Sequence, residues 1–388
     1  MMNGTIKQDR GEIAVSRRVR ASGFSFRDLE RIAERREIIG NIKVNTDVVR
    51  MTCTRFDWLY KCLLADDLIP PKDAEELEAR CMIVAAPSGA GKSHLMRRLR
   101  EHPALVPSMD EYGPLRPLVA VKAPSPCTLT TLGLKLNQVL TGKWLPSYYK
   151  QHEVWTEFYA QAEGQGVAVV MIDEAHHLMT ARNREECHTV VETFKNLIVP
   201  NPEDPLRLPG STLRPIMLVI GGMPQIVRIL EKDKQLLRRR LVVKIDPWAN
   251  DQSGLERATK FLSLVETKLG FTGTEFLSDR DMVRRMMAAS NGYGGRMMAL
   301  VKEASFLAIG SNSSQLDREK HLAKVFEEIF QLGPKKNPFL VADVSKCKRV
   351  PEKSYDRLSL LRGTGDEIPG DDEQAPAEID SEKNQAAA

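Results

Sequence analysis

The sequence predicts an α/β fold in which a parallel five-stranded sheet lies between helices and a small helical domain follows. Five apolar runs recur between residues 81 and 246, separated by helical or loop stretches. Strands that are apolar along their whole length, alternating with helices, are typical of a parallel sheet covered on both faces. After Trp248 the pattern changes to three successive helical stretches with Gly or Ser breaks. The runs are CMIVAA from 81, PLVAVKA from 117, VAVVMID from 167, RPIMLVIGG from 214 and LVVKID from 241.

Composition sets broad limits. The chain has 388 residues and a formal net charge of +4, but its last 24 residues carry −7, which leaves +11 for the rest. A basic body is compatible with a nucleic-acid partner and equally typical of an ordinary soluble surface. The six cysteines form no Cys-x-x-Cys pair, which disfavours zinc and disulfide frameworks. No stretch approaches the roughly 20 apolar residues of a membrane span, so we expect a cytoplasmic protein.

A phosphate-binding loop is predicted where the first apolar run meets a helix. Residues 86–93 read APSGAGKS, the pattern of such a loop with alanine in place of the first glycine. Backbone N–H groups would wrap a polyphosphate, Lys92 would neutralise its β and γ phosphates, and the Ser93 hydroxyl would bind Mg²⁺. The candidate nucleotide-binding residues are Ala86, Pro87, Ser88, Gly89, Ala90, Gly91, Lys92, Ser93 and His94.

An acidic pair, Asp173 and Glu174, ends the third apolar run. Ligands bind at the carboxyl ends of the strands in sheets of this kind. Asp173 would hold Mg²⁺ through water, and Glu174 would orient and polarise the attacking water. A helix cap is the other interpretation of such a pair. The phosphate loop, with one complete strand unit between the two motifs, favours catalysis.

Phosphoryl transfer needs positive charge beyond Lys92, because the enzyme acts mainly by positioning and by neutralising charge. Arg238, Arg239 and Arg240 stand directly before the fifth strand, and Arg296 stands near the start of a helix in the sequence GGR. Taken alone, the triple arginine is as compatible with a solvated charged surface.

In this order the motifs resemble those of the AAA+ ATPases, a family of P-loop NTPases. The narrower likeness is to the TniB and TnsC group, ATP-dependent regulators of DNA transposition. It comes from PLVAVKAPSP, RPIMLVIGGMPQ and DKQLLRRRLVVKIDPW, and the whole likeness spans roughly residues 55–307. The resemblance implies an ATPase that uses ATP and Mg²⁺.

The resemblance also implies roles for the arginines. A neighbouring subunit would insert Arg239 into the ATP site as an arginine finger, with Arg238 or Arg240 as alternatives. Arg296 would be the sensor 2 residue, which touches the γ phosphate from the lid. The usual polar sensor 1 residue falls within GGMPQ, where only Gln225 could serve, so we expect slow, DNA-stimulated turnover.

Partners follow from the same resemblance. Proteins of this group assemble as ATP-bound rings or filaments on duplex DNA, without reading its sequence, and attract transposase and target-selection proteins. Hydrolysis then dismantles the homo-oligomer. Cationic and hydroxyl side chains after the early strands would contact DNA phosphates, although each alone is more typical of a plain surface. The candidates are Lys122, Thr128, Thr130, Thr131 and Lys143.

The predicted organisation has five parts. They are a basic N-terminal arm with a short helix (1–54), the α/β nucleotide-binding domain (55–248), a helical lid (249–310), a C-terminal helix with an irregular extension (311–363) and a disordered acidic tail (364–388).

Three other functions compete with this interpretation. The letters DEAH at 173–176 occur in helicases, which need a second parallel-sheet domain that the helices after Trp248 do not supply. A replication initiator or helicase loader would use the same motor, and a winged-helix domain after the lid would favour an initiator. Residues 311–363 look too short and irregular for one. A non-hydrolysing adaptor stays open because sensor 1 lacks its usual residue, while Glu174 and Arg239 favour hydrolysis.

Overall fold

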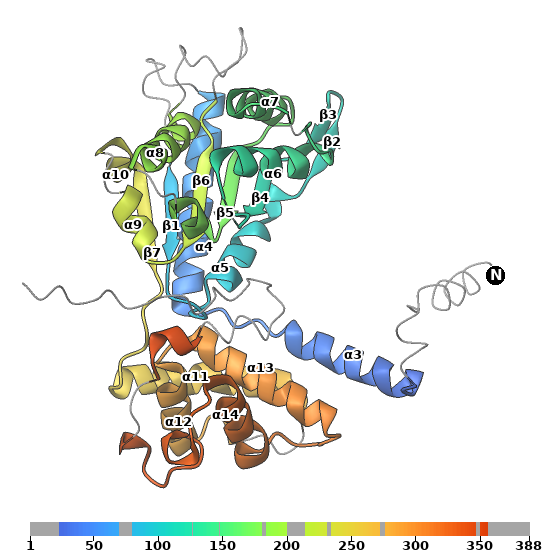
Figure 1. The fold of residues 1–388 in the computed structure, drawn as a ribbon, viewed down its shortest axis with the longest axis vertical. Helices are drawn as coiled ribbons and strands as arrows, with labels where there is room; N and C mark the ends of the chain where they lie inside the picture. Colours follow the sequence, from blue (N-terminus) through green and yellow to red (C-terminus); the bar gives the residue numbers. More distant parts are fainter. Residues whose placement is uncertain are drawn as a thin grey trace, which may run out of the picture.

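The computed structural model describes residues 23–69, 80–125, 127–146, 148–180, 184–199, 214–230, 234–271, 276–346 and 350–355. These residues form two lobes, one built around a sheet and one entirely helical (Figure 1). The predicted acidic tail and the first 22 residues lie outside the described ranges.

The main sheet of the sheet lobe has five strands in the order β4-β5-β6-β1-β7, and every neighbouring pair in it is parallel. Each of the first four predicted apolar runs contains one whole strand. The fifth run contains all of β7 except its first residue, Arg240. This confirms the predicted α/β fold. The strands are β4 (Leu118–Lys122), β5 (Val169–Asp173), β6 (Met217–Gly222), β1 (Cys81–Ala85) and β7 (Arg240–Lys244).

Helices connect the strands and lie on both sides of the sheet (Figure 1). A short hairpin, β2 (Ser108–Asp110) with β3 (Gly113–Leu115), follows the first of these connections. The helices of this lobe are α4 (Asp47–Leu68), α5 (Lys92–Arg100), α6 (Leu129–Thr141), α7 (Gln151–Gly164), α8 (Arg184–Ile198), α9 (Gln225–Leu230) and α10 (Lys234–Arg239), with a 3-10 turn at Ala175–Thr180.

The predicted boundary at residues 54 and 55 falls inside α4. This helix begins after Thr46, whose side chain accepts from the N–H of Val49 at 3.5 Å. Val49 and Phe56 both pack into the core of the sheet lobe, so the two sides of the predicted boundary share one core.

The helical lobe is larger than the predicted lid. Its helices are α11 (Gln252–Leu269), α12 (Arg280–Ser290), α13 (Gly294–Gly310) and α14 (Lys324–Phe330). Its core also takes in Ile39 of α3 (Phe26–Gly40) and Tyr355, both almost fully buried. Part of the predicted N-terminal arm and the described part of the predicted extension therefore pack on the lid, because each offers an apolar face that this lobe covers. Short helical turns at Arg318–Ala323, Pro334–Lys336, Val344–Lys346 and Glu352–Tyr355 complete the lobe.

Trp248 joins the two lobes after β7. Its N–H donates to the carbonyl of Gly292 at 2.9 Å, and its ring packs edge-on against Phe261. Among the helices of the described ranges, none is both long enough and apolar enough to cross a bilayer.

Candidate nucleotide-binding site

The predicted phosphate loop connects the fully buried strand β1 to helix α5. Gly89 and Gly91 have φ angles of +71° and +116°, where an L side chain would be strained. Ala86 is not among the residues with positive φ, and its N–H donates to the carbonyl of Gly222 at 3.2 Å. Alanine at this position is therefore compatible with the loop.

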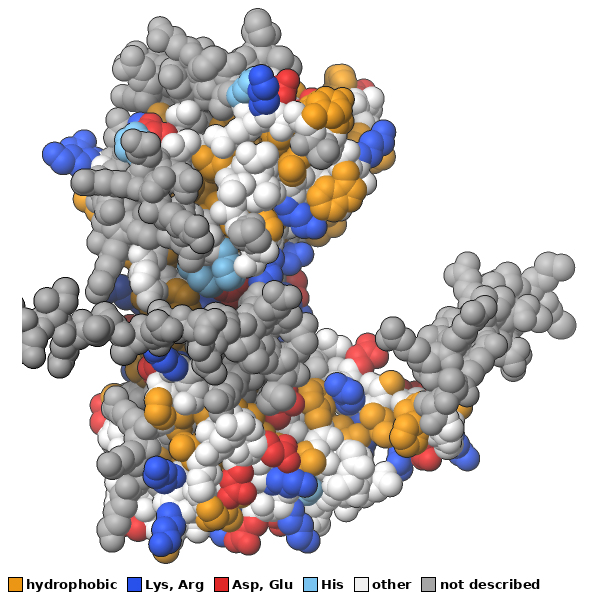
Figure 2. All heavy atoms as spheres, viewed as in Figure 1, with side chains coloured by type: hydrophobic (Ala, Val, Ile, Leu, Met, Phe, Trp, Pro, Cys, Tyr) orange, Lys and Arg blue, Asp and Glu red, His pale blue; other side chains and the backbone are white. Residues whose placement is uncertain are grey.

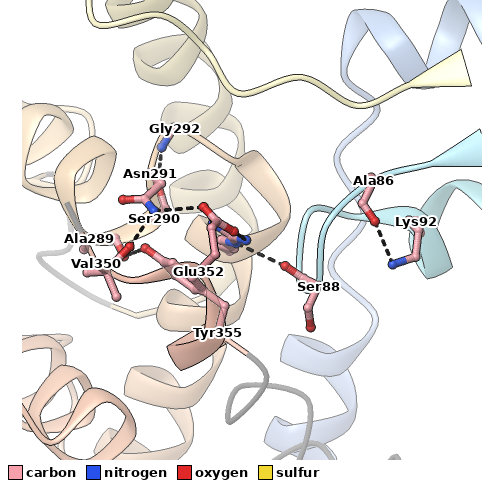
Figure 3. Close-up of polar contacts among 11 residues, drawn as sticks. Ala86, Ser88, Lys92, Ala289, Ser290, Asn291, Gly292, Val350, Glu352 and Tyr355 are labelled. Carbon is pink, nitrogen blue, oxygen red and sulfur yellow. Dashed lines mark hydrogen bonds and ion pairs between the residues drawn. The ribbon is translucent and has the colours of Figure 1, made fainter. Parts of the chain in front are cut away.

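Lys92 begins α5 and its side chain lies under the loop. It is 5% exposed, and its Nζ donates to the Ala86 carbonyl at 3.1 Å (Figure 3). A buried ammonium group favours an anionic partner, and the amides at the start of a helix favour phosphate. Ser93 is exposed at the second position of the helix, where its hydroxyl is accessible to a metal ion. Burial lowers the pKa of the half-buried His94, and Arg97 lowers it further, so this side chain is neutral at pH 7.

The acidic pair lies at the carboxyl end of β5. Strand β6 lies between β5 and β1, and the phosphate loop follows β1. Glu174 has a φ of +53°, which is uncommon for a residue other than glycine and is typical of functional sites. Its N–H donates to Asp173 Oδ1 at 2.9 Å, and its Oε2 lies 3.1 Å from His176 Nδ1.

The two carboxylates have opposite electrostatic surroundings. Burial and the charge of Glu174 raise the pKa of Asp173. Burial also acts to raise the pKa of Glu174, but His176 and Lys92 outweigh it and lower this pKa to about 2. Glu174 is therefore ionised at neutral pH. Asp173 is a buried acid whose charged form is favoured by a nearby cation.

The end of β6 explains why no polar sensor 1 side chain is present there. A Cβ on Gly221 would lie 2.7 Å from Asp173 Oδ1, so a side chain at this position would displace the carboxylate. Gln225, the predicted substitute, is exposed at the first position of α9.

The lid brings Arg296 to the loop. Arg296 Nε donates to the Ser88 carbonyl at 3.1 Å, and the arginine side chain is completely buried. The approach is close because of Gly295, where a Cβ would lie 2.4 Å from the Gly89 carbonyl oxygen. The structure thus brings together the loop, the acidic pair and the predicted sensor 2 arginine.

Residues 75–230 match the sequence family described as AAA domain. Four of the five strands of the parallel sheet, the loop and the acidic strand end lie within this range, and β7 (Arg240–Lys244) lies outside it. Residues 75–230, called the AAA domain from here on, are therefore similar to AAA-type P-loop ATPase domains.

Several solved structures are similar to this chain. The Aeropyrum pernix ORC1 protein in complex with DNA has a TM-score of 0.51 at 15% identity, covering 76% of this chain and 69% of that chain. The Aeropyrum pernix ORC2 protein has a TM-score of 0.49 at 14% identity, covering 76% and 71%. The Thermotoga maritima RuvB Holliday junction branch migration motor has 0.39 at 12%, covering 79% and 86%. None of the curated proteins is significantly similar to the chain in sequence.

The three consecutive arginines lie at the amino ends of the strands, whereas the loop lies at their carboxyl ends. Arg240 is the register partner of Cys81, the first residue of β1, whereas the loop follows the last residue of that strand. Five residues of strand separate the two positions by roughly 17 Å. Arg238 is exposed on α10, and Arg239 and Arg240 are partly buried. The structure therefore does not bring these arginines into their own chain's site.

The five DNA candidates fall into two groups. Lys122 is the register partner of Asp173 and is exposed at the carboxyl edge of the sheet. Thr128 and Thr131 are close by and cap α6: the Thr131 N–H donates to Thr128 Oγ1 at 3.1 Å, and the Thr128 N–H to Thr131 Oγ1 at 2.8 Å. Thr130 lies in the first turn of the same helix.

Lys143 follows the other end of α6, about 20 Å away at 1.5 Å per residue. The structure thus separates it from the other four candidates.

Two further features are absent from the predictions made from sequence. His176 contacts Glu174, and the C-terminal residues Glu352 and Tyr355 contact Arg296. His176 is only two residues from Glu174 in the sequence, so a contact between them could have been predicted. Nothing local links residues 352 and 296.

Hydrophobic side chains gather at the upper right of the sheet lobe, over the β2–β3 hairpin and α6 (Figure 2). The exposed hydrophobic residues in or next to these elements include Met109, Tyr112, Trp144 and Tyr148, which are 66–89% exposed. This surface lies near Lys143, away from the loop.

Proposed function

We propose that the chain binds ATP and Mg²⁺ at the AAA domain and hydrolyses ATP slowly. Lys92 and the loop amides would hold the β and γ phosphates, and Ser93 and Asp173 would hold Mg²⁺, which would neutralise phosphate charge. Glu174, ionised at neutral pH, would orient the attacking water. The observation that carries this proposal is the convergence of the loop, the acidic pair and the buried Arg296 at one edge of the sheet.

We infer that a complete site contains two chains. The arginines at 238–240 lie about 17 Å from their own loop, and α10 ends at the edge strand β7. Arg239 is the proposed finger because of the motif resemblance, while Arg238 is the most exposed of the three. A finger supplied by a neighbour would make assembly depend on bound ATP.

The proposed partner of this oligomer is duplex DNA, bound without sequence preference. Lys122, with its exposed charge at the carboxyl edge of the sheet, is the leading contact, and Thr128 and Thr130 lie near it. The ORC1 protein that shares the fold was solved in complex with DNA, which is consistent with this proposal. DNA contacts of this kind involve phosphates, so binding should weaken as salt is raised.

The proposed role is regulation of DNA transposition in the cytoplasm. The assembled oligomer would mark a target, recruit a transposase and a target-selection protein, and disassemble on hydrolysis. The support is the resemblance of the second strand, fourth strand and arginine region to the TniB and TnsC group.

Electron microscopy with duplex DNA and a slowly hydrolysed ATP analogue tests this function. Rings or filaments on DNA are expected for the wild type. Lys92→Ala, which removes the positive charge proposed to bind the β and γ phosphates, is expected to give neither. Monomers on bare duplex in the wild-type sample would contradict the proposal.

A replication initiator or helicase loader is the second candidate, favoured by the fold shared with ORC1. The described residues of 311–355 form helical turns that pack into the lid, which does not favour a separate winged-helix domain there. Stimulation of strand transfer by a purified transposase would support the regulator. ATP-dependent loading of a replicative helicase would support the second candidate.

A further inference from the structure

The predicted sensor 2 arginine is already occupied by an anion from the same chain. Arg296 Nη1 and Nη2 lie 3.2 Å and 2.5 Å from the two carboxylate oxygens of Glu352, and Nε donates to the Ser88 carbonyl (Figure 3). The guanidinium group also lies 4.5 Å from the ring centroid of Tyr293 and 3.6 Å from that of Tyr355. Both terminal nitrogens, which would contact a γ phosphate, therefore contact Glu352.

The segment that carries Glu352 is anchored to the lid on both sides. The Tyr355 hydroxyl donates to the Ala289 carbonyl at 2.8 Å, and the tyrosine side chain is completely buried. Asn291 Nδ2 donates to the Val350 carbonyl at 2.9 Å and to Glu352 Oε1 at 3.1 Å. These contacts place the carboxylate in front of the arginine instead of leaving it on a mobile surface chain.

The burial of the two partners is unequal. The side chain of Arg296 is 0% exposed, whereas that of Glu352 is 57% exposed. A buried cation without an anion is strongly unfavourable, while an exposed carboxylate can return to water at small cost. Exchange of Glu352 for another anion therefore costs less than leaving Arg296 without one.

We propose that Glu352 is a specificity-determining residue that competes with the γ phosphate for Arg296. Without ATP the carboxylate holds the guanidinium group; when ATP binds, the more highly charged γ phosphate takes its place and Glu352 turns to solvent. ADP has no γ phosphate and leaves the pair intact. The strength of the pair thus sets how well the protein discriminates ATP from ADP. This inference rests on the proposed ATP function.

The test is the ratio of the ADP to the ATP dissociation constants, measured on the full chain with ADP and a non-hydrolysable ATP analogue. In Glu352→Gln the competitor loses its charge, and the ratio should rise roughly tenfold or more because a charge-assisted contact is removed from the ATP-free states only. Glu319→Gln is the matched control: Glu319 pairs with Arg318 on the lid surface, so its ratio should equal the wild type's.

A second variant covers the case in which Glu352→Gln does not fold. Asn291→Gly removes the hydrogen bond to Glu352 but tolerates the φ of +53° at this position, and should raise the ratio by a smaller factor. An unchanged ratio in the folded variants would overturn the inference. A lower ratio would also overturn it, because Glu352 would then position Arg296 for the phosphate. If the wild type binds neither nucleotide, the proposed ATP function itself fails.

Discussion

Gly295 makes the contact between the lid and the phosphate loop possible, and Gly295→Ala should break it. The added Cβ would lie 2.4 Å from the Gly89 carbonyl oxygen, 2.5 Å from the carbonyl carbon of Ala90 and 2.6 Å from the Gly91 nitrogen. All three are backbone atoms of one loop, so no flexible side chain can turn away. The α13 end must therefore move by about 1 Å to reach an ordinary contact of ~3.5 Å.

Two costs decide how large the effect is. If the lid stays in place, overpacking costs ~1–3 kcal/mol. If it moves by that distance, the Arg296 to Ser88 hydrogen bond, now 3.1 Å, is lost, and a charged donor contributes about 1.5–3 kcal/mol. The molecule will take the less costly route, so the minimum loss is ~1–1.5 kcal/mol. Because the proposed ATP site needs the lid against the loop, this loss corresponds to a roughly tenfold weaker affinity for an ATP analogue.

Titration with a fluorescent ATP analogue measures this loss. Gly310→Ala is the control, because Gly310 lies at the other end of the same helix and a Cβ added there would meet no atom within 4 Å. Replacing that glycine should leave binding unchanged and stabilise the protein by about 0.4–1 kcal/mol. The reasoning is refuted if the two variants bind the analogue equally well while both remain folded in thermal unfolding.

The remaining predictions concern the catalytic groups. Lys92→Ala should abolish nucleotide binding and assembly together, as followed by equilibrium titration and light scattering. Glu174→Gln should still bind ATP but lose DNA-stimulated phosphate release. Equal rates of phosphate release in the wild type and in this variant would leave the non-hydrolysing adaptor as the function. Arg239→Ala should bind ATP yet hydrolyse it slowly, and mixing it with Glu174→Gln should restore activity by placing an intact finger against an intact site. The pKa of Glu174, now about 2, should rise in His176→Asn, so the acid limb of the pH–rate profile should move to higher pH.

The sign of the pH effect follows from the direction of the shift. The pKa of Glu174 in the folded protein lies below its ordinary value of 4.5. Its contribution to stability is therefore present above the unfolded pKa and is lost as the pH falls toward 2. Removing His176 should raise the pKa of Glu174, so this contribution to stability should be lost at a higher pH than in the wild type. A pH–rate profile that is identical in wild type and His176→Asn would contradict the assignment.

The parts of the fold that could be predicted from sequence are those with a local signal. An apolar run, a glycine-rich loop and a helix start are adjacent in the chain, as are β5 and its acidic pair. Buried parallel strands need little more than continuous apolar residues, so the five strands could be found one by one. Thr128 and Thr131 are predicted from sequence as DNA contacts, although a threonine pair at this spacing also caps helices, and the structure has that cap.

The parts that could not be predicted depend on pairing between distant segments. Ile39 and Tyr355 join one core, but neither the N-terminal helix nor the irregular C-terminal stretch indicates which lobe will cover its apolar side. Gly221 illustrates the same limit: its missing side chain is explained only by the Asp173 carboxylate across the sheet, 48 residues earlier in the chain.

The arrangement of charges around Arg296 connects the two proposals. In its own chain the arginine has a carboxylate partner, and the loop has a buried lysine whose charge favours an anion. A triphosphate would satisfy both cations at once, and would draw the lid and the AAA domain together through the loop. A finger supplied by a neighbouring chain, as proposed, would then approach the same phosphate in a closed site. If ATP binding is as tight in Arg296→Ala as in the wild type, the lid does not sense the γ phosphate and this coupling is absent.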